Sequence, residues 1–154
     1  MKPAAFTVSD NSRLSSIITN AFMRQSVELC RDYKLKHQQA EVLALWDTGA
    51  TGSSVSQGLA RHLGLKPIDM CLVQGVKGVD PSPVYLIDIL LPSNVAINNV
   101  RVAEFQDNGI FAMIIGMDII TLGDLAISNK DKKTIVSFRI PPSENPIDFT
   151  KDIS

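Results

Sequence analysis

The chain has 154 residues, of which 45% are hydrophobic and 20% are charged, and its formal net charge is −1. This balance is typical of a soluble globular domain, and the near-zero charge provides no field that would attract nucleic acid or an anionic membrane. We expect one domain over residues 1–140, followed by a C-terminal tail over residues 141–154 that contains three prolines and is either mobile or packed against a partner.

No segment has the pattern of a secretory or membrane sequence. Residues 1–10 lack the apolar core of a secretory signal. The most apolar stretch, residues 110–120, is short and contains Gly116 and Asp118, which favours a core segment over a membrane span. Cys30 and Cys71 have no metal-ligand or redox spacing, so we expect two reduced thiols in a cytoplasmic protein, with a disulfide between them still open.

Short apolar runs separated by glycine, proline and polar residues predict a mainly β fold, because strands joined by turns have this pattern. The segments 41–46 and 84–91 have apolar residues at successive positions, which indicates strands buried on both faces. The predicted strands cover residues 14–22, 27–35, 42–46, 70–75, 84–91, 100–105, 113–115, 125–128 and 134–140.

Two short helices are predicted between these strands. The first covers residues 55–63, with Ser54 as its N-cap and Gly64 at the position after its end. Its apolar residues form one stripe, at Val55, Leu59 and Leu63. The second covers residues 118–122, where a carboxylate at the first position complements the helix dipole.

The segment Asp47-Thr48-Gly49-Ala50-Thr51 follows a predicted buried strand and precedes the first helix. Asp47 places a carboxylate at the strand end, where its ionisation depends on its surroundings. The hydroxyl of Thr48 can fix the loop backbone, and Gly49 lets another backbone or a substrate come close. The pattern therefore indicates a pinned carboxylate beside a narrow open space, although Asx-type turns between a strand and a helix have it too.

A second carboxylate would make this site a peptide hydrolase. Two carboxyl groups about 3 Å apart cannot both ionise, so they share one proton. The ionised group then draws a proton from water, and the protonated group polarises the peptide carbonyl. Asp-Thr-Gly occurs once in the chain, so the second group must come from another copy in a twofold-symmetric homodimer. This chemistry needs no metal and no organic cofactor.

A second segment, Ala112-Met113-Ile114-Ile115-Gly116, reads as a buried strand followed by glycine. Together with the Asp47-Thr48-Gly49-Ala50 segment before it, it resembles the retropepsin family of aspartic proteases, including its bacterial retroviral-like members. The similarity runs from about Val42 to Leu125. It implies a mainly β, single-domain acid-protease fold, closed as a symmetric homodimer that cuts extended peptides.

The resemblance also implies roles for the matching residues. Asp47 would be the catalytic aspartate, Thr48 would interlock the two loops at the dimer axis, and Gly49 would approach the substrate backbone. Ile115 and Gly116 would support the catalytic loop. The residues expected to contact the substrate are Leu45, Ala50, Thr51, Gly75, Val76, Ala112 and Ile114.

Members of this family close a β-hairpin flap over the substrate, and residues 73–78 match it best, although an ordinary glycine-containing hairpin looks the same. The chain departs from the retroviral pattern at Thr51 and Met117, which stand where an acidic residue and an arginine are common. The ion pair that braces the retroviral dimer is therefore missing in that form. We expect the additional segments, for instance residues 134–140, to provide interface strands.

Three other interpretations stay open. Actin-like and sugar-kinase ATPases carry Asp-x-Gly-x-Thr-Gly, which residues 47–52 match. Those folds need two nucleotide-clasping subdomains and a strand after the loop, where a helix is predicted here. A retropepsin fold can also be a catalytically silent dimerisation or peptide-binding module. A plain β-rich structural domain is the third.

Overall fold

The computed structural model describes residues 2–34, 38–75 and 78–153, and these are mainly β, as the apolar pattern predicts. No helix in these ranges is long and apolar enough to cross a membrane. The helices are α1 (Val27–Tyr33), α2 (Gln57–His62) and α3 (Met117–Ile120). The strands are β1 (Ala4–Asp10), β2 (Ile17–Gln25), β3 (Gln39–Trp46), β4 (Ser54–Ser56), β5 (Pro67–Gly75), β6 (Gly78–Leu91), β7 (Val95–Phe105), β8 (Met113–Ile115), β9 (Asp124–Ser128) and β10 (Thr134–Ile140).

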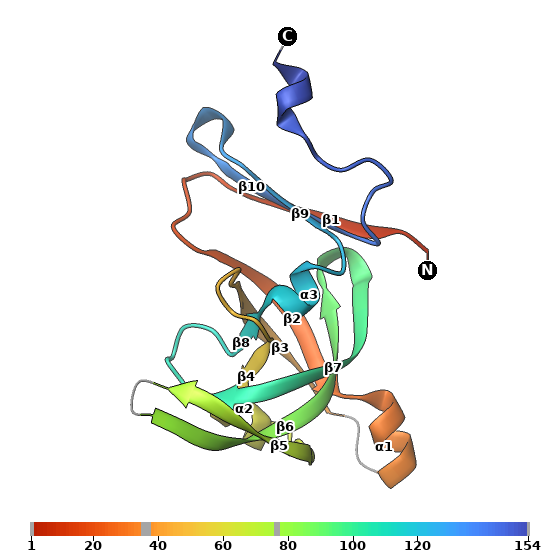
Figure 1. Ribbon diagram of the computed structural model, residues 1–154. Helices are drawn as coiled ribbons and strands as arrows, with labels where there is room; N and C mark the ends of the chain where they lie inside the picture. Colours follow the sequence, from red (N-terminus) through yellow and green to blue (C-terminus); the bar gives the residue numbers. More distant parts are fainter. Residues whose placement is uncertain (1, 35–37, 76–77, 154) are drawn as a thin grey trace.

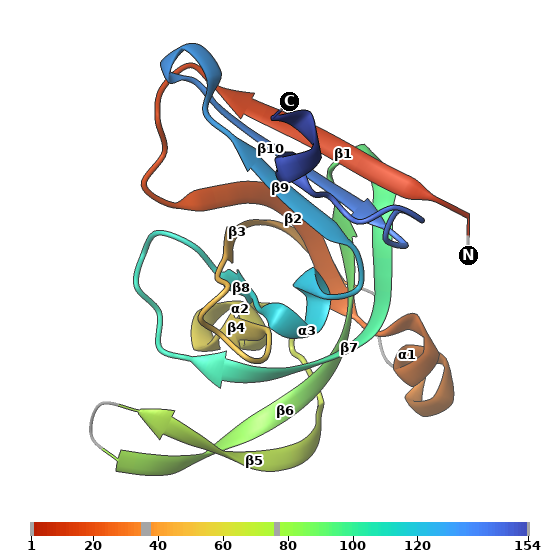
Figure 2. The same cartoon turned by 45° about the horizontal axis from the view of Figure 1, so that its top comes forward.

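A closed β-barrel forms the body of the protein (Figure 1). Its strands pair in the order β2-β3-β8-β4-β7-β6, and β6 pairs again with β2 to close the ring. β5 pairs only with the first half of β6 in the described chain, so the two form a long hairpin that leaves the barrel (Figure 2). Side chains from several barrel strands are fully buried inside: Ala44, Val55, Ile87, Met113 and Ile115.

A second, antiparallel sheet joins the two ends of the chain in the order β1-β10-β9 and lies against one end of the barrel (Figures 1 and 2). β10 is its middle strand, with its backbone paired to β1 on one side and to β9 on the other. The expectation that residues 134–140 provide an interface strand is therefore wrong, because both edges of this strand are occupied within the chain.

Three aromatic rings join the terminal sheet to the barrel. The ring of Trp46, at the end of β3, lies 5.9 Å from Phe6 on β1 and 5.1 Å from Phe138 on β10, measured between ring centroids. The Trp46 indole N–H also donates to the hydroxyl of Thr19 at 2.9 Å. Since buried rings of this size carry much of the apolar area of a core, they fix the strand end that precedes Asp47.

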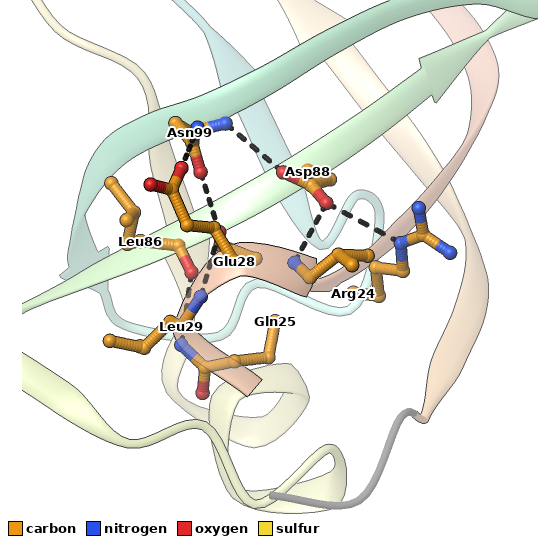
Figure 3. A network of polar contacts seen from close by, with 9 residues as sticks. Arg24, Gln25, Glu28, Leu29, Leu86, Asp88 and Asn99 are labelled. Atoms are coloured by element: carbon orange, nitrogen blue, oxygen red, sulfur yellow. Dashed lines mark hydrogen bonds and ion pairs between the residues drawn. The ribbon is translucent and has the colours of Figure 1, made fainter. Parts of the chain in front are cut away.

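The prediction of a strand over residues 27–35 is wrong, because residues 27–33 form α1. Figure 3 shows the polar network that holds this helix against the barrel. The buried Asp88 carboxylate accepts from the Val27 N–H at 3.0 Å and the Asn99 N–H at 3.0 Å, and pairs with Arg24 at 3.5 Å. Ser26 caps the helix. These contacts come from distant strands, so the local apolar spacing could not reveal them.

Other boundaries differ from the sequence prediction for local reasons. The first helix starts two residues later, with Ser56 and not Ser54 as its cap, because residues 54–56 form the short strand β4. The predicted strand at 84–91 begins at residue 78, across Pro81 and Pro83. β1 is an additional strand. β3 is buried on one face only, since Leu43 is 45% exposed.

Candidate active site

The loop of residues 47–53 connects β3 to β4 and lies beside the end of β8. β8 pairs in parallel with β3, where Leu45 is opposite Ile114 and Trp46 opposite Ile115. It pairs antiparallel with β4 on its other side. This arrangement brings Asp47, which follows β3, next to Gly116, which follows β8, so the two sequence motifs meet at one place.

Asp47 is held by its own loop and by β8. Its N–H donates to the carbonyl of Ile115 at 2.9 Å, and its carbonyl accepts from the Ala50 N–H at 3.2 Å. The Oδ1 atom of its carboxylate accepts from the Gly49 N–H at 2.8 Å, which forms an Asx turn. The Asp47 side chain is half-buried, so a pinned carboxylate at the surface is what the loop presents.

Gly116 allows the loop of residues 47–53 to lie directly against the start of α3. A Cβ atom at this position would lie 2.7 Å from the Gly52 carbonyl carbon and 2.9 Å from the Ala50 carbonyl oxygen. Next to it, the Met117 N–H donates to the Ala50 carbonyl at 2.8 Å and the Asp118 N–H to the Thr51 carbonyl at 3.2 Å. The loop is therefore braced through its backbone, and any side chain at position 116 would push this brace apart.

Ser53 and Asp118 form a second brace that sequence reasoning missed. The buried Ser53 hydroxyl donates to Asp118 Oδ1 at 2.7 Å, and the Ser53 N–H donates to Asp118 Oδ2 at 3.0 Å. The same hydroxyl accepts from the Gly116 N–H at 3.0 Å. The sequence pattern predicts for Asp118 only that its carboxylate complements the helix dipole. The available signal was a serine and an aspartate flanking the two motifs, but their pairing spans 65 residues.

The residues predicted to meet substrate differ in where they lie. Leu45, Ala50, Ala112 and Ile114 are half-buried, whereas Thr48, Gly49 and Thr51 are exposed on the loop of residues 47–53. Ile115 and Gly116 are buried behind that loop. Leu45 and Ile114 occupy paired positions on neighbouring strands, so the structure brings them together.

The predicted flap, residues 73–78, falls at the end of the β5–β6 hairpin where β5 leads into β6. Gly75 ends β5 and pairs with Gly78 at the start of β6. Val76 lies outside the described residues. The described part therefore forms a hairpin at the predicted place, and its role over a substrate stays a prediction.

The remaining ionisable candidates do not form a site of their own. Cys30 and Cys71 are both free thiols, and burial of Cys30, together with the nearby Asp88 charge, raises its pKa. Across the described ranges, no group of three or more His, Cys, Asp or Glu side chains is placed to hold a metal ion. The carboxylate of Asp47 is thus the group that the braced loop makes available for chemistry.

The comparisons with known proteins agree with this geometry. The family model described as aspartyl protease matches residues 33–119, more than half of the chain. A retropepsin-like aspartic protease from Rickettsia conorii has a similar structure, with a TM-score of 0.54 and 12% identity over 90% of this chain and 96% of that one. This likeness shows a shared fold. A search of the curated proteins found no match.

Two further solved structures are less similar. The simian foamy virus (mac) protease gives a TM-score of 0.46 and 15% identity, over 69% of this chain and 93% of that one. The retroviral protease-like domain of Ddi1 from Leishmania major gives 0.47 and 14%, over 77% and 85%.

A short strand, β4, follows the loop of residues 47–53 where the sequence predicts a helix, so the elements after the loop do not exclude the ATPase interpretation. The family match decides the question instead, since it covers this loop and the whole of β4 and β8. With its retropepsin-like fold and its Asp-Thr-Gly loop, the chain belongs to the aspartyl protease family.

Proposed function

We propose that the protein is an aspartic endopeptidase whose active site forms between two copies of the chain. The observation that carries this proposal is the half-buried Asp47 carboxylate on a loop braced by Gly116 and Asp118, within an aspartyl protease family member. Each chain supplies one such loop, because Asp-Thr-Gly occurs once. Asp47 of the partner subunit supplies the second carboxylate.

The proposed reaction uses a water molecule held between the two carboxyl groups. Because two like charges at this distance cannot both ionise, the pair carries one proton over a wide pH range. The ionised member takes a proton from the water as it attacks the peptide carbonyl, and the protonated member donates to the carbonyl oxygen. No covalent intermediate forms. We expect mildly acidic pH to favour the reaction, since the pair must keep its proton.

The free edge of β9 is the surface that we propose for dimerisation. Within the described chain, β9 pairs with β10 alone, so its other edge offers unpaired backbone groups. Ile127 on β9 and Leu122, two residues before β9, are 50% and 47% exposed, so a partner that covers them would remove apolar surface from water. β9 also follows α3, whose start braces the catalytic loop. Pairing of β9 with its copy would therefore bring the two catalytic loops toward one axis, where the exposed Thr48 side chains would interlock.

The substrate that fits this arrangement is an extended peptide, bound by β-type backbone hydrogen bonds under the flap. We propose that Leu45, Val76, Ala112 and Ile114 form apolar pockets for the side chains next to the cut bond. Ala50, Thr51 and Gly75 would contact the peptide backbone. Hydrophobic residues on both sides of the cut are therefore expected.

The domain and its setting are also proposals. Residues 1–140 form the protease domain, and residues 141–154 form a tail attached to it, where the Ser143 N–H donates to Asp124 at 2.7 Å. Two free thiols suit a reducing compartment, so we place the protein in the cytoplasm. We propose no cofactor, no nucleic-acid partner and no membrane partner.

The experiment that tests this function compares the parent chain with Asp47→Asn on a peptide library, with the association state measured by sedimentation. We expect the parent to cut peptides between apolar residues and the variant to lose about 10⁴-fold or more in kcat, because it lacks the ionisable pair. The variant should remain a folded dimer. A parent dimer that binds peptides without cutting them would instead make the protein a silent peptide-binding module, and a variant that cuts like the parent would remove Asp47 from the mechanism.

A further inference from the structure

The loop of residues 106–112 connects β7 to β8 and is attached to the barrel at its carboxyl end. The Ala112 N–H donates to the Leu43 carbonyl at 3.0 Å, and the Ala112 carbonyl accepts from the Ser56 N–H at 2.9 Å. Ala112 is therefore fixed by backbone bonds to β3 and to the end of β4. The rest of the loop needs a different anchor.

Asp107 provides that anchor at the first turn of α2. Its Oδ2 atom accepts from the Gly58 N–H at 2.9 Å, a group that has no partner inside the helix. A Cβ atom on Gly58 would lie 2.6 Å from Asp107 Oδ1, which is too close for the carboxylate to stay. We call this contact between Gly58 and Asp107 the loop latch. It requires both a carboxylate in the loop and a glycine in the helix.

Between the latch and Ala112, the loop is a preformed unit. The side chain of Asn108 accepts from the Ile110 N–H at 2.9 Å and the Phe111 N–H at 3.2 Å. The Phe111 ring lies 5.8 Å from the Phe105 ring between centroids. Residues 107–111 therefore keep their shape and can move together when the latch opens.

The space beside the loop makes its position sensitive to the latch. A groove of about 500 Å³ lies between the loop, α2 and β3, lined by residues that include Leu43, His62 and Phe111. Ile110 is 63% exposed. Because close packing does not fill this side, a hydrogen bond to a charged group has a large share in fixing the loop.

We propose that Asp107 and Gly58 are positioning residues for substrate selection, an inference that rests on the proposed function. The latch holds residues 107–111 in place. Ile110 and Ala112 then present an apolar wall to a substrate side chain next to the cut bond. The loop projects on the same side of the barrel as the end of the β5–β6 hairpin where β5 leads into β6 (Figures 1 and 2). Opening the latch moves the wall while Asp47, held by β8 and α3, stays in place.

The test uses Gly58→Ala, Asp107→Ala and the double variant in the full chain. Gly58→Ala displaces the carboxylate but favours the helix, so it breaks the latch without an expected loss of folding. Asp32→Ala is the matched control, because it removes an exposed carboxylate from α1, far from the loop in Figure 1. Each variant is assayed with two peptides that differ only beside the cut bond, one with phenylalanine and one with alanine.

We expect each single variant to raise KM for the phenylalanine peptide about fivefold, with kcat within about twofold, since the latch is one hydrogen bond to a charged group. KM for the alanine peptide should change little. KM for the phenylalanine peptide should be no higher in the double variant than in either single variant, because both substitutions remove the same contact. Hydrogen exchange at the Ile110 and Phe111 amides should accelerate in both single variants.

Two outcomes separate this inference from the proposed function. If the parent cuts peptides and both single variants keep its preference for phenylalanine, or if their effects add in the double variant, the latch has no role in selection. A parent that cuts no peptide contradicts the proposed function, and the selection role falls with it.

Discussion

The loop of residues 47–53 and the β5–β6 hairpin lie in the same protein but are held in opposite ways. Residues 47–53 contact β8 and α3 through backbone hydrogen bonds and through the hydrogen bonds of the buried Ser53 to Asp118. In the half of the hairpin that lies outside the barrel, β5 and β6 pair only with each other in the described chain. Leu72 on β5 is 74% exposed. Pro81 and Pro83 remove two backbone donors from β6 there.

This difference separates two requirements of a protease. In the proposed mechanism, a pair of carboxyl groups must stay within a fraction of an ångström of its working geometry, and bracing of the Asp47 region from two sides would meet this requirement. A cover over an extended peptide must open and close, so it should have few buried contacts. Changes in the braced region should therefore alter kcat and stability, and changes in the hairpin should alter KM.

Among substitutions that compare the braced region with the hairpin, the largest effect is expected from Gly116→Ala. The added methyl group meets the backbone of Gly52 and Ala50, which cannot yield as a flexible side chain can. We expect a loss of about 1–3 kcal/mol in the free energy of unfolding and a fall of roughly 100-fold in kcat. Denaturant unfolding and peptide cleavage measure the two effects. The matched control is Gly52→Ala, because a Cβ atom there meets nothing within 4 Å and stability should be kept.

The second-largest effect is expected from Asp118→Ala. It leaves the buried Ser53 hydroxyl and N–H without their carboxylate, which should cost about 1–3 kcal/mol of unfolding free energy and lower kcat. A double-mutant cycle with Ser53→Ala measures the coupling. Additive effects of the two substitutions would show that this pair does not brace the loop.

A smaller effect is expected from Thr48→Ala, which acts on association and not on the fold. The exposed threonine is proposed to interlock with its copy, so its loss should raise the dimer dissociation constant about fivefold, as for one or two ordinary hydrogen bonds. Sedimentation at a series of concentrations gives this constant. An unchanged value would argue against interlocked loops.

The smallest effect on stability is expected in the hairpin. Leu72→Thr should change the free energy of unfolding by no more than about 0.5 kcal/mol, because the side chain is largely exposed, yet it should raise KM. The comparison is Ile115→Thr on β8, where the side chain is fully buried and the loss should be several-fold larger. Equal losses at the two positions would show that the hairpin is packed as firmly as the barrel.

The sequence was most informative where local pattern and tertiary structure agree. Residues 113–115 and 134–140 form the predicted strands with the predicted ends, and the apolar run before Asp47 ends at Trp46 as expected. The two motifs of the site could be found because each directly follows a strand that is rich in apolar residues. Their approach follows from the pairing of β3 with β8.

The sequence predictions are wrong or incomplete where residues that are distant in the chain determine the structure. α1 depends on Asp88, and the loop brace depends on Ser53 and Asp118, which are far apart in the chain. β6 crosses two prolines because β5 pairs with the segment that contains them, while β7 and β2 pair with the rest. None of these contacts leaves a periodic signal in the sequence, so only the folded structure could provide them.

The central claim is that one active site needs Asp47 from two chains, and a subunit-mixing measurement tests it most directly. The parent is mixed and re-equilibrated with about a ninefold excess of Asp47→Asn chains, so that most parent chains pair with a variant chain. We predict that peptide cleavage per parent chain falls about tenfold, because only parent–parent dimers hold two ionisable carboxyl groups. Cleavage per parent chain that stays constant across the mixing series would contradict the shared site.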